Sequence, residues 1–218
     1  MNKKKRFIGK GRKNDMGLYT IGHSTNTIEY FVKLLKKYEI DYLLDVRSVP
    51  YSKYMPQFNK ENIREELKRE SITYFHMGKY FGARQEDDTL YHDEGYLDFD
   101  KVRAGKLFQI GMKNVEKGLA EGHNIALMCT EKDPMDCHRT IMVARGFELD
   151  GVEVKHILKD GNLETQEELN NRLLAHYFPK YEQLDIFSYT QKEESKEERL
   201  IQAYRIRNKE LGYRKDNR

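Results

Sequence analysis

Side chains able to carry chemistry follow four short apolar segments of this sequence. Each segment has the length and composition of a buried strand, and the four lie at 18–21, 42–46, 72–75 and 125–128. Small, polar or titratable residues come directly after them, at 22–25, 47–50, 76–79 and 129–131. Because ligands in open α/β sheets bind beyond the carboxyl ends of the strands, these positions predict one active site.

Two carboxylates belong to this predicted site. Asp45 lies near the end of the second segment, and Glu131 comes two residues after Cys129 at the end of the fourth. Hydrolysis of a glycosidic bond needs an acid for the leaving group and a second carboxylate for the cationic centre or the water. Asp45 and Glu131 therefore predict acid–base chemistry on an N-glycosidic bond, and we assign His23 to the same catalytic group. The alternative for Asp45 is a simple ion pair with Arg47, which lies on the same side of the strand.

Two arginines and two helix starts predict a phosphate site beside the carboxylates. Arg47 follows the second strand, and Arg139 opens an expected helix at 139–149. A guanidinium group binds phosphate through paired hydrogen bonds, and exposed N–H groups at a helix start favour anions. Ser24 lies before another expected helix, where it either contacts the anion or only caps the helix together with Asn26.

The cysteines allow two further interpretations. Cys129 at a strand end is a possible thiolate nucleophile, stabilised by Arg139 and a helix start. A zinc site would need Cys129, Cys137 and His138, completed by His23. The Cys-x7-Cys-His spacing fits no standard zinc module, so we predict neither a metal nor a cofactor and assign His138 to substrate binding. Buried packing as a small apolar residue is the third option for either cysteine.

Five motifs occur in a characteristic order and spacing: TIGHS at 20–24, LDVRSVP at 44–50, PQF at 56–58, GAR at 82–84 and MCTEKDPMDCHR at 128–139. Together they resemble the domain-of-unknown-function family numbered 488 over about residues 17–160. The family usually has two glycines before the arginine of the GAR motif, where this chain has Gly82 and Ala83. Within the motifs we assign Gln57 and Arg84 to substrate or phosphate binding. The resemblance implies a link to nucleic-acid and modified-base processing.

These observations predict an enzyme that acts on nucleic acid or nucleotides. We expect it to hydrolyse an N-glycosidic bond in the manner of a DNA glycosylase, including one for modified bases. Two alternatives remain open. The first is a cysteine-dependent enzyme that transfers sulfur or phosphoryl groups, and the second is a non-catalytic module that binds nucleotides or nucleic acid.

Strands and helices alternate along the chain, which predicts an α/β fold with a mostly parallel sheet, helices on both faces and a C-terminal helical extension. Capping patterns open expected helices at Asn26, Asn59 and Thr165, whereas 78–100 is expected to be a long loop. We divide the chain into a basic tail at 1–15, an α/β domain at 16–178 and a charged helical extension at 179–218.

The charge distribution favours a polyanionic partner. Residues 1–15 carry seven Lys or Arg against one acid, and 188–218 carry nine against six, so an acidic body lies between two basic ends. The alternative is that the basic ends only improve solubility. No apolar run approaches the roughly 20 residues of a membrane span. Two cysteines in 218 residues exclude a disulfide framework, which predicts the reducing cytoplasm.

Overall fold

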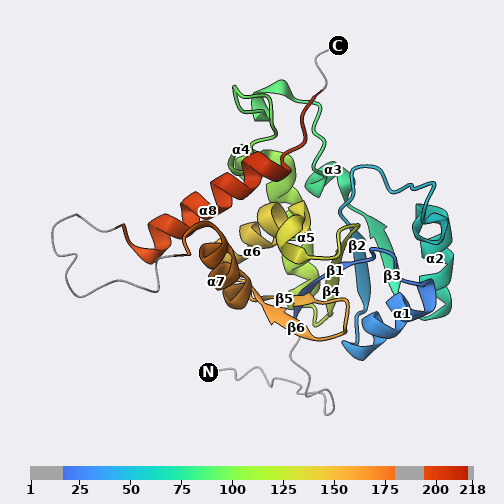
Figure 1. Ribbon diagram of the computed structural model, residues 1–218. Coiled ribbons are helices and arrows are strands. Elements are labelled where there is room, and N and C mark those ends of the chain that lie inside the picture. The colour runs from blue at the N-terminus through green and yellow to red at the C-terminus, as the bar shows by residue number, and fades with distance from the viewer. Residues whose placement is uncertain (1–16, 180–193, 216–218) are drawn as a thin grey trace, which may run out of the picture.

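The computed structural model describes residues 17–179 and 194–215 and contains one central sheet (Figure 1). Within these residues the strands are β1 Leu18–Gly22, β2 Tyr42–Asp45, β3 Thr73–His76, β4 Ile125–Cys129, β5 Val154–Ile157 and β6 Leu163–Thr165. Their order in the sheet is β3-β2-β4-β1-β5-β6. The first five strands run parallel, and β6 pairs antiparallel with β5. The predicted mostly parallel sheet is confirmed.

The strand β4 lies between β2 and β1, so the chain reverses its direction of winding at this place. Ile125 is aligned with both Leu18 and Tyr42, and the carboxyl ends of the three strands are therefore nearly level. Cys129, at the end of β4, is paired with Gly22, at the end of β1. A crevice at such a reversal is where open α/β sheets bind ligands, because the loops leave in opposite directions.

Two helices cover one face of the sheet, α1 Ile28–Lys37 and α2 Lys60–Arg69 (Figure 1). Phe31 and Leu35 of α1, and Ile63 and Leu67 of α2, are four residues apart, so each pair lies on one side of its helix. All four are completely buried and join Phe58 in one apolar cluster against the sheet. The 3-10 turn Pro56–Phe58 delivers Phe58 to that cluster.

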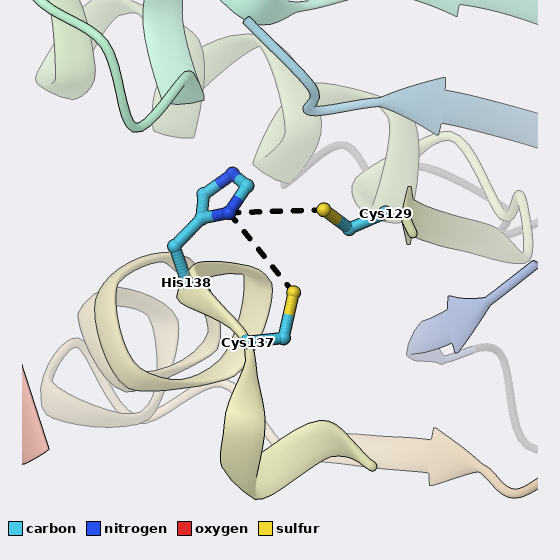
Figure 2. A group of neighbouring side chains, drawn as sticks. All are labelled: Cys129, Cys137 and His138. Atoms are coloured by element: carbon cyan, nitrogen blue, oxygen red, sulfur yellow. Dashed lines mark hydrogen bonds between the residues drawn. The ribbon is translucent and has the colours of Figure 1, made fainter. Parts of the chain in front are cut away.

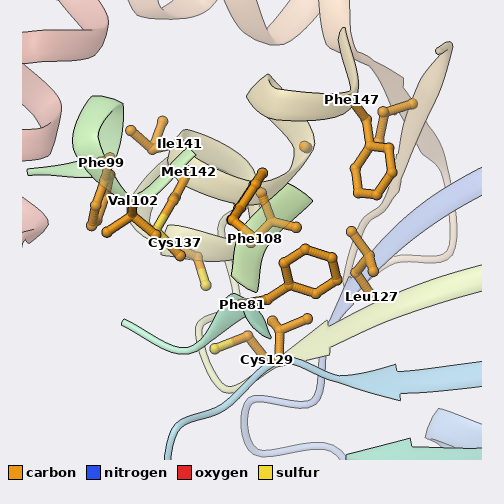
Figure 3. Packing of buried hydrophobic residues seen from close by; sticks show 14 of the residues in the cluster. Phe81, Phe99, Val102, Phe108, Leu127, Cys129, Cys137, Ile141, Met142 and Phe147 are labelled. Carbon is orange, nitrogen blue, oxygen red and sulfur yellow. The ribbon is translucent and has the colours of Figure 1, made fainter. Parts of the chain in front are cut away.

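The remaining helices pack together on the other face: α3 Gly78–Phe81, α4 Phe99–Ala104, α5 Lys106–Ala120, α6 Arg145–Leu149, α7 Gln166–Tyr177 and α8 Lys196–Leu211. Figure 3 shows Phe81 at the centre of this second cluster. Its ring meets the edges of Phe108 and Phe147, with centroids 5.1 and 6.1 Å apart. Cys129 and Cys137 belong to the same cluster, which places them between the apolar core and the edge of the sheet.

Several local predictions need correction. Helix α1 is capped by Thr27, whose hydroxyl accepts the Tyr30 N–H, and not by Asn26. The expected helix at 139–149 begins as a π-helical turn, Arg139–Ala144, before α6. The expected loop at 78–100 contains α3 and the 3-10 turn Asp88–Leu90, and β6 was not predicted. These elements are three to six residues long, too short to produce a periodic pattern.

The C-terminal helix α8 is part of the same core, although its sequence is highly charged. Leu200, Ala203 and Tyr204 are buried in the cluster around Phe81. The expected tail at 1–15 lies outside the described residues, as does 180–193. Among the helices that the structure describes, none is long and apolar enough to cross a membrane.

Candidate functional site

A pocket of about 320 Å³ opens at the carboxyl ends of β2 and β4. Predicted site residues line it: Arg47, Arg84, Cys129, Glu131 and His138. Leu211 and Tyr213, from the end of α8 and the segment after it, form another part of its wall. The expected convergence at this edge of the sheet is therefore present for these five residues, and the C-terminal segment contributes to the same pocket.

Asp45 does not face this pocket but is fully buried in an ion pair. Its two carboxylate oxygens accept hydrogen bonds from Arg47 Nε and Nη2, at 2.8 and 2.6 Å. One oxygen also accepts the hydroxyl of Tyr74 on β3 at 2.7 Å. Burial first, and the Asp45 charge second, raise the pKa of Tyr74. Asp45 thus holds Arg47 and Tyr74 in place, which is the ion-pair alternative raised from the sequence.

Arg47 continues this network to His23. Its Nη2 donates to the Phe58 carbonyl at 2.8 Å, and its Nη1 lies 3.3 Å from His23 Nε2. Burial and the Arg47 charge lower the pKa of His23 to about 4, so the ring is neutral near pH 7. Because Arg47 can only donate, Nε2 accepts and the proton is on Nδ1, which donates to the Ser24 carbonyl at 3.0 Å. His23 is a buried part of the scaffold, stacked on Phe58.

A second group forms around the end of β4, where Cys129, Cys137 and His138 converge (Figure 2). His138 Nδ1 lies 3.7 Å from Cys129 Sγ and 4.0 Å from Cys137 Sγ. Oε2 of Glu131 lies 3.1 Å from the first sulfur and 2.8 Å from the second. These four residues are called the thiol cluster below. His23, which the zinc interpretation would have needed as a fourth ligand, lies instead with Arg47 and Phe58.

The loop after β4 is held so that both cysteines reach the same point. Asp133 caps the 3-10 turn Pro134–Asp136 through the Met135 N–H, and Arg172 of α7 holds its two oxygens at 2.8 and 2.7 Å. Arg139 donates to the Glu131 carbonyl at 2.7 Å. Gly22 permits this loop to approach β1, because a Cβ there would lie 1.9 Å from the same carbonyl oxygen.

The charges within the thiol cluster favour one thiolate, on Cys137. Burial raises the pKa of Cys129 well above its usual value, and the neighbouring Cys137 adds to that rise. Burial also acts to raise the pKa of Cys137, but Cys129, Arg139 and His138 lower it well below the usual value. Desolvation and the charge of Cys137 raise the pKa of Glu131. Contacts with Cys137 outweigh burial and raise the pKa of His138.

The predicted anion-binding residues differ in what they contact. Arg47 and Arg139 lie at the same edge of the sheet, but Arg47 is paired with Asp45 and Arg139 holds the loop carbonyls. Arg84 is exposed, and its guanidinium lies over the Tyr213 ring at 4.9 Å. Gln57 is half-buried beside the Asn26 carbonyl. Ser24 has a φ of 45° and donates its N–H to the Thr130 carbonyl.

The site residues assigned from the sequence leave out several that line the pocket, including Ser48, Asp136 and Tyr213. Ser48 accepts the Arg84 N–H at 2.8 Å through its hydroxyl. Its position directly after the second strand was a signal for Ser48, and both Ser48 and Asp136 lie within the quoted motifs. A larger groove of about 1060 Å³ adjoins this pocket. Glu131 and Asp136 lie between the two and line both the pocket and the groove.

The fold and the site define an open α/β protein with a cluster of two thiols, an imidazole and a carboxylate at the carboxyl edge of its parallel sheet. The family described as "Domain of unknown function DUF488" matches residues 27–145, which is more than half of the chain. This chain belongs to that family. No curated protein and no solved structure matches it.

Proposed function

We propose that this protein is a hydrolase that acts on nucleotides or nucleic acid and cleaves an N-glycosidic bond, with Glu131 as the acid–base group. The observation that carries the proposal is the position of Glu131, whose carboxyl lies against two thiols at the wall of a pocket. Desolvation raises its pKa, as a carboxyl that must donate a proton near neutral pH requires.

Asp136 takes the place that the sequence suggested for Asp45 in this proposal. The carboxylate oxygens of Asp45 are hydrogen-bonded to Arg47 and Tyr74, whereas Asp136 lines the same pocket as Glu131. Asp136 is exposed to solvent and paired with Arg207. Two carboxyl groups beside a single pocket are what glycosidic hydrolysis uses, one as the acid and one for the cationic centre or the water.

The substrate class rests on the remaining wall of the pocket. Arg84 supplies an exposed guanidinium for a phosphate, and Tyr213 beneath it offers an aromatic face for a base. The groove on the other side of Glu131 has five acidic and three basic lining residues. We therefore propose that a phosphate backbone binds on the Arg84 side. The basic residues at 1–15 lie outside the described residues, and their charge supports the same class of partner.

The test measures release of free base by chromatography from nucleosides, nucleotides and oligonucleotides that carry ordinary or modified bases. Glu131→Gln is expected to lower the rate by about 10²–10⁴-fold, the usual contribution of a positioned acid–base group. Asp136→Asn should lower it as well. Glu61→Gln, an exposed carboxyl on α2, is the matched control and should leave the rate unchanged. Full activity in Glu131→Gln contradicts the proposal.

A cysteine-dependent transfer enzyme is the second candidate, because one observation favours it. Cys137 lies against His138 and near Arg139, and these neighbours lower its thiol pKa. Adding Cys137→Ser to these variants separates the candidates. Loss of activity in Cys137→Ser together with full activity in Glu131→Gln supports thiolate chemistry, whereas the reverse pattern supports carboxyl chemistry.

A further inference from the structure

Two sulfurs and one imidazole nitrogen converge on a single point beside the end of β4 (Figure 2). Cys129 Sγ, Cys137 Sγ and His138 Nδ1 all lie within 4.8 Å of one another, and Nδ1 is 3.7 and 4.0 Å from the two sulfurs. Ligand atoms of a tetrahedral zinc ion lie about 3.6–3.8 Å apart, given its usual bonds to sulfur and nitrogen. His138 Nδ1 therefore already lies at nearly the separation from each sulfur that a metal ion requires, and the two sulfurs lie within 4.8 Å of each other.

We propose that Cys129, Cys137 and His138 bind one divalent metal ion of the zinc type, with the Glu131 carboxylate beside its fourth coordination position. The donor set selects the metal. Thiolate and imidazole ligands favour zinc over magnesium or calcium, which prefer oxygen. The spacing Cys-x7-Cys-His is not that of a standard zinc module. The two cysteines nevertheless meet, because the loop between them folds back and is held by the Asp133–Arg172 ion pair.

The orientation of the His138 ring supports metal binding independently of the distances. Its Nε2 lies 3.1 Å from the Val46 carbonyl oxygen at the end of β2, and since a carbonyl only accepts, Nε2 carries a proton. Nδ1 is consequently the nitrogen directed at the two sulfurs. A backbone carbonyl that fixes the far nitrogen in this way is the usual partner of a metal-ligating histidine.

The surroundings of the sulfurs suit a charged metal–thiolate group. The Arg139 N–H donates to Cys137 Sγ at 3.5 Å, and such bonds stabilise a bound thiolate. Two thiolates and Glu131 carry three negative charges, so a divalent ion and Arg139 together balance them.

The fourth position opens onto the pocket, which gives the ion an entry path and a place for water. Cys129, Glu131 and His138 line that pocket, while Cys137 lies behind them. Three protein ligands with one open position are typical of catalytic zinc sites. In a step that rests on the proposed function, an ion held by these three residues would supply an activated water. Glu131 would take a proton from that water and pass it to the departing base as the carbon–oxygen bond forms and the N-glycosidic bond breaks.

The test begins with the full chain, purified under reducing conditions and freed of metal with a chelator. Zinc is then added in competition with a chromophoric chelator, and the protein is expected to bind about one zinc ion. Cobalt(II) in place of zinc should give the strong near-ultraviolet absorption of cobalt–thiolate bonds and the visible bands of a tetrahedral site. His138→Asn should weaken zinc binding by more than about 100-fold, because it removes a direct ligand rather than an outer partner.

Controls separate a missing ligand from a failure to fold. His176→Asn changes an exposed histidine on α7 and should leave both metal affinity and the cobalt spectrum unchanged. The wild-type chain tests the proposal even if a cluster variant fails to fold. No bound zinc at millimolar addition, or a cobalt spectrum without the thiolate band, overturns the proposal. Zinc binding without any base release overturns only the proposed function, and base release by a chain that binds no metal overturns only this inference.

Discussion

Replacing Asp45 by Asn should destabilise the fold strongly rather than act on the chemistry alone. The substitution removes the charge that pairs with Arg47 and leaves a buried guanidinium opposite a neutral amide. Breaking one side of a buried ion pair costs about 3–5 kcal/mol of unfolding free energy. For a chain of this size that corresponds to a fall in melting temperature of roughly 6–20 °C.

Urea unfolding and thermal melts of a graded set of variants measure this effect. Tyr74→Phe removes one hydrogen bond to Asp45 and should cost about 1.5–3 kcal/mol, the range for a bond to a charged group. Asp150→Asn, at an exposed carboxylate after α6, should stay within about 0.5 kcal/mol of the wild type.

The double variant Asp45→Asn/Arg47→Met completes the set, because it removes both charges together. It should be less destabilised than the sum of the two single variants, since neither leaves its partner unpaired. The reasoning fails if Asp45→Asn lowers the unfolding free energy by less than about 1 kcal/mol while abolishing base release. That result would return Asp45 to the catalytic role first inferred from the sequence.

Three further predictions follow from other parts of the chain. His156 is buried between Thr20 and Gln166, and desolvation first, then the charges of Arg139 and Arg172, lower its pKa to about 3. Because the unfolded chain takes up this proton below about pH 6.5 and the folded chain does not, His156 should contribute a fall in stability of about 2 kcal/mol between pH 7 and 5. In urea titrations His156→Gln should remove that contribution, while the fall due to His23, whose pKa burial lowers to about 4, remains. Gly22→Ala should cost about 1–3 kcal/mol and weaken zinc binding, because its Cβ displaces the loop at the Glu131 carbonyl; an unchanged zinc affinity would refute this effect. Deleting 1–15 should flatten the plot of log affinity for duplex DNA against log salt, by about 0.9 for each phosphate that these residues neutralise, whereas a pure solubility tail leaves the slope unchanged.

The positions of the first four strands, and the edge of the sheet at which the site lies, were predictable because each strand can be identified from a short stretch of sequence. Four apolar runs, each followed by polar residues, locate β1, β2, β3 and β4 without knowledge of any distant partner. The way in which Asp45 is used was not predictable in the same manner. Its spacing from Arg47 allowed both an ion pair and a shared substrate contact. Tyr74 and the Phe58 carbonyl, which decide between them, come from other elements.

The thiol cluster could not be predicted either, because it too depends on contacts between distant parts of the chain. Cys129 and His138 are nine residues apart, and they meet only because the intervening loop folds back on itself. That fold depends on Arg172 of α7, far along the chain, and on the absence of a side chain at Gly22. The π-helical turn that begins at Arg139 has no sequence pattern that distinguishes it from an α-helix.

The two networks at this edge of the sheet are connected through the end of β2. Asp45 and Arg47 fix the backbone on either side of Val46, whose N–H donates to the Met128 carbonyl on β4 at 3.0 Å. The carbonyl of Val46 is the group that orients His138. The buried ion pair therefore sets the position of one ligand of the thiol cluster without touching it. The end of β2 therefore affects both the stability of the fold and the geometry of the site. Conservative changes at Asp45 should weaken metal binding to the extent that they displace the Val46 carbonyl.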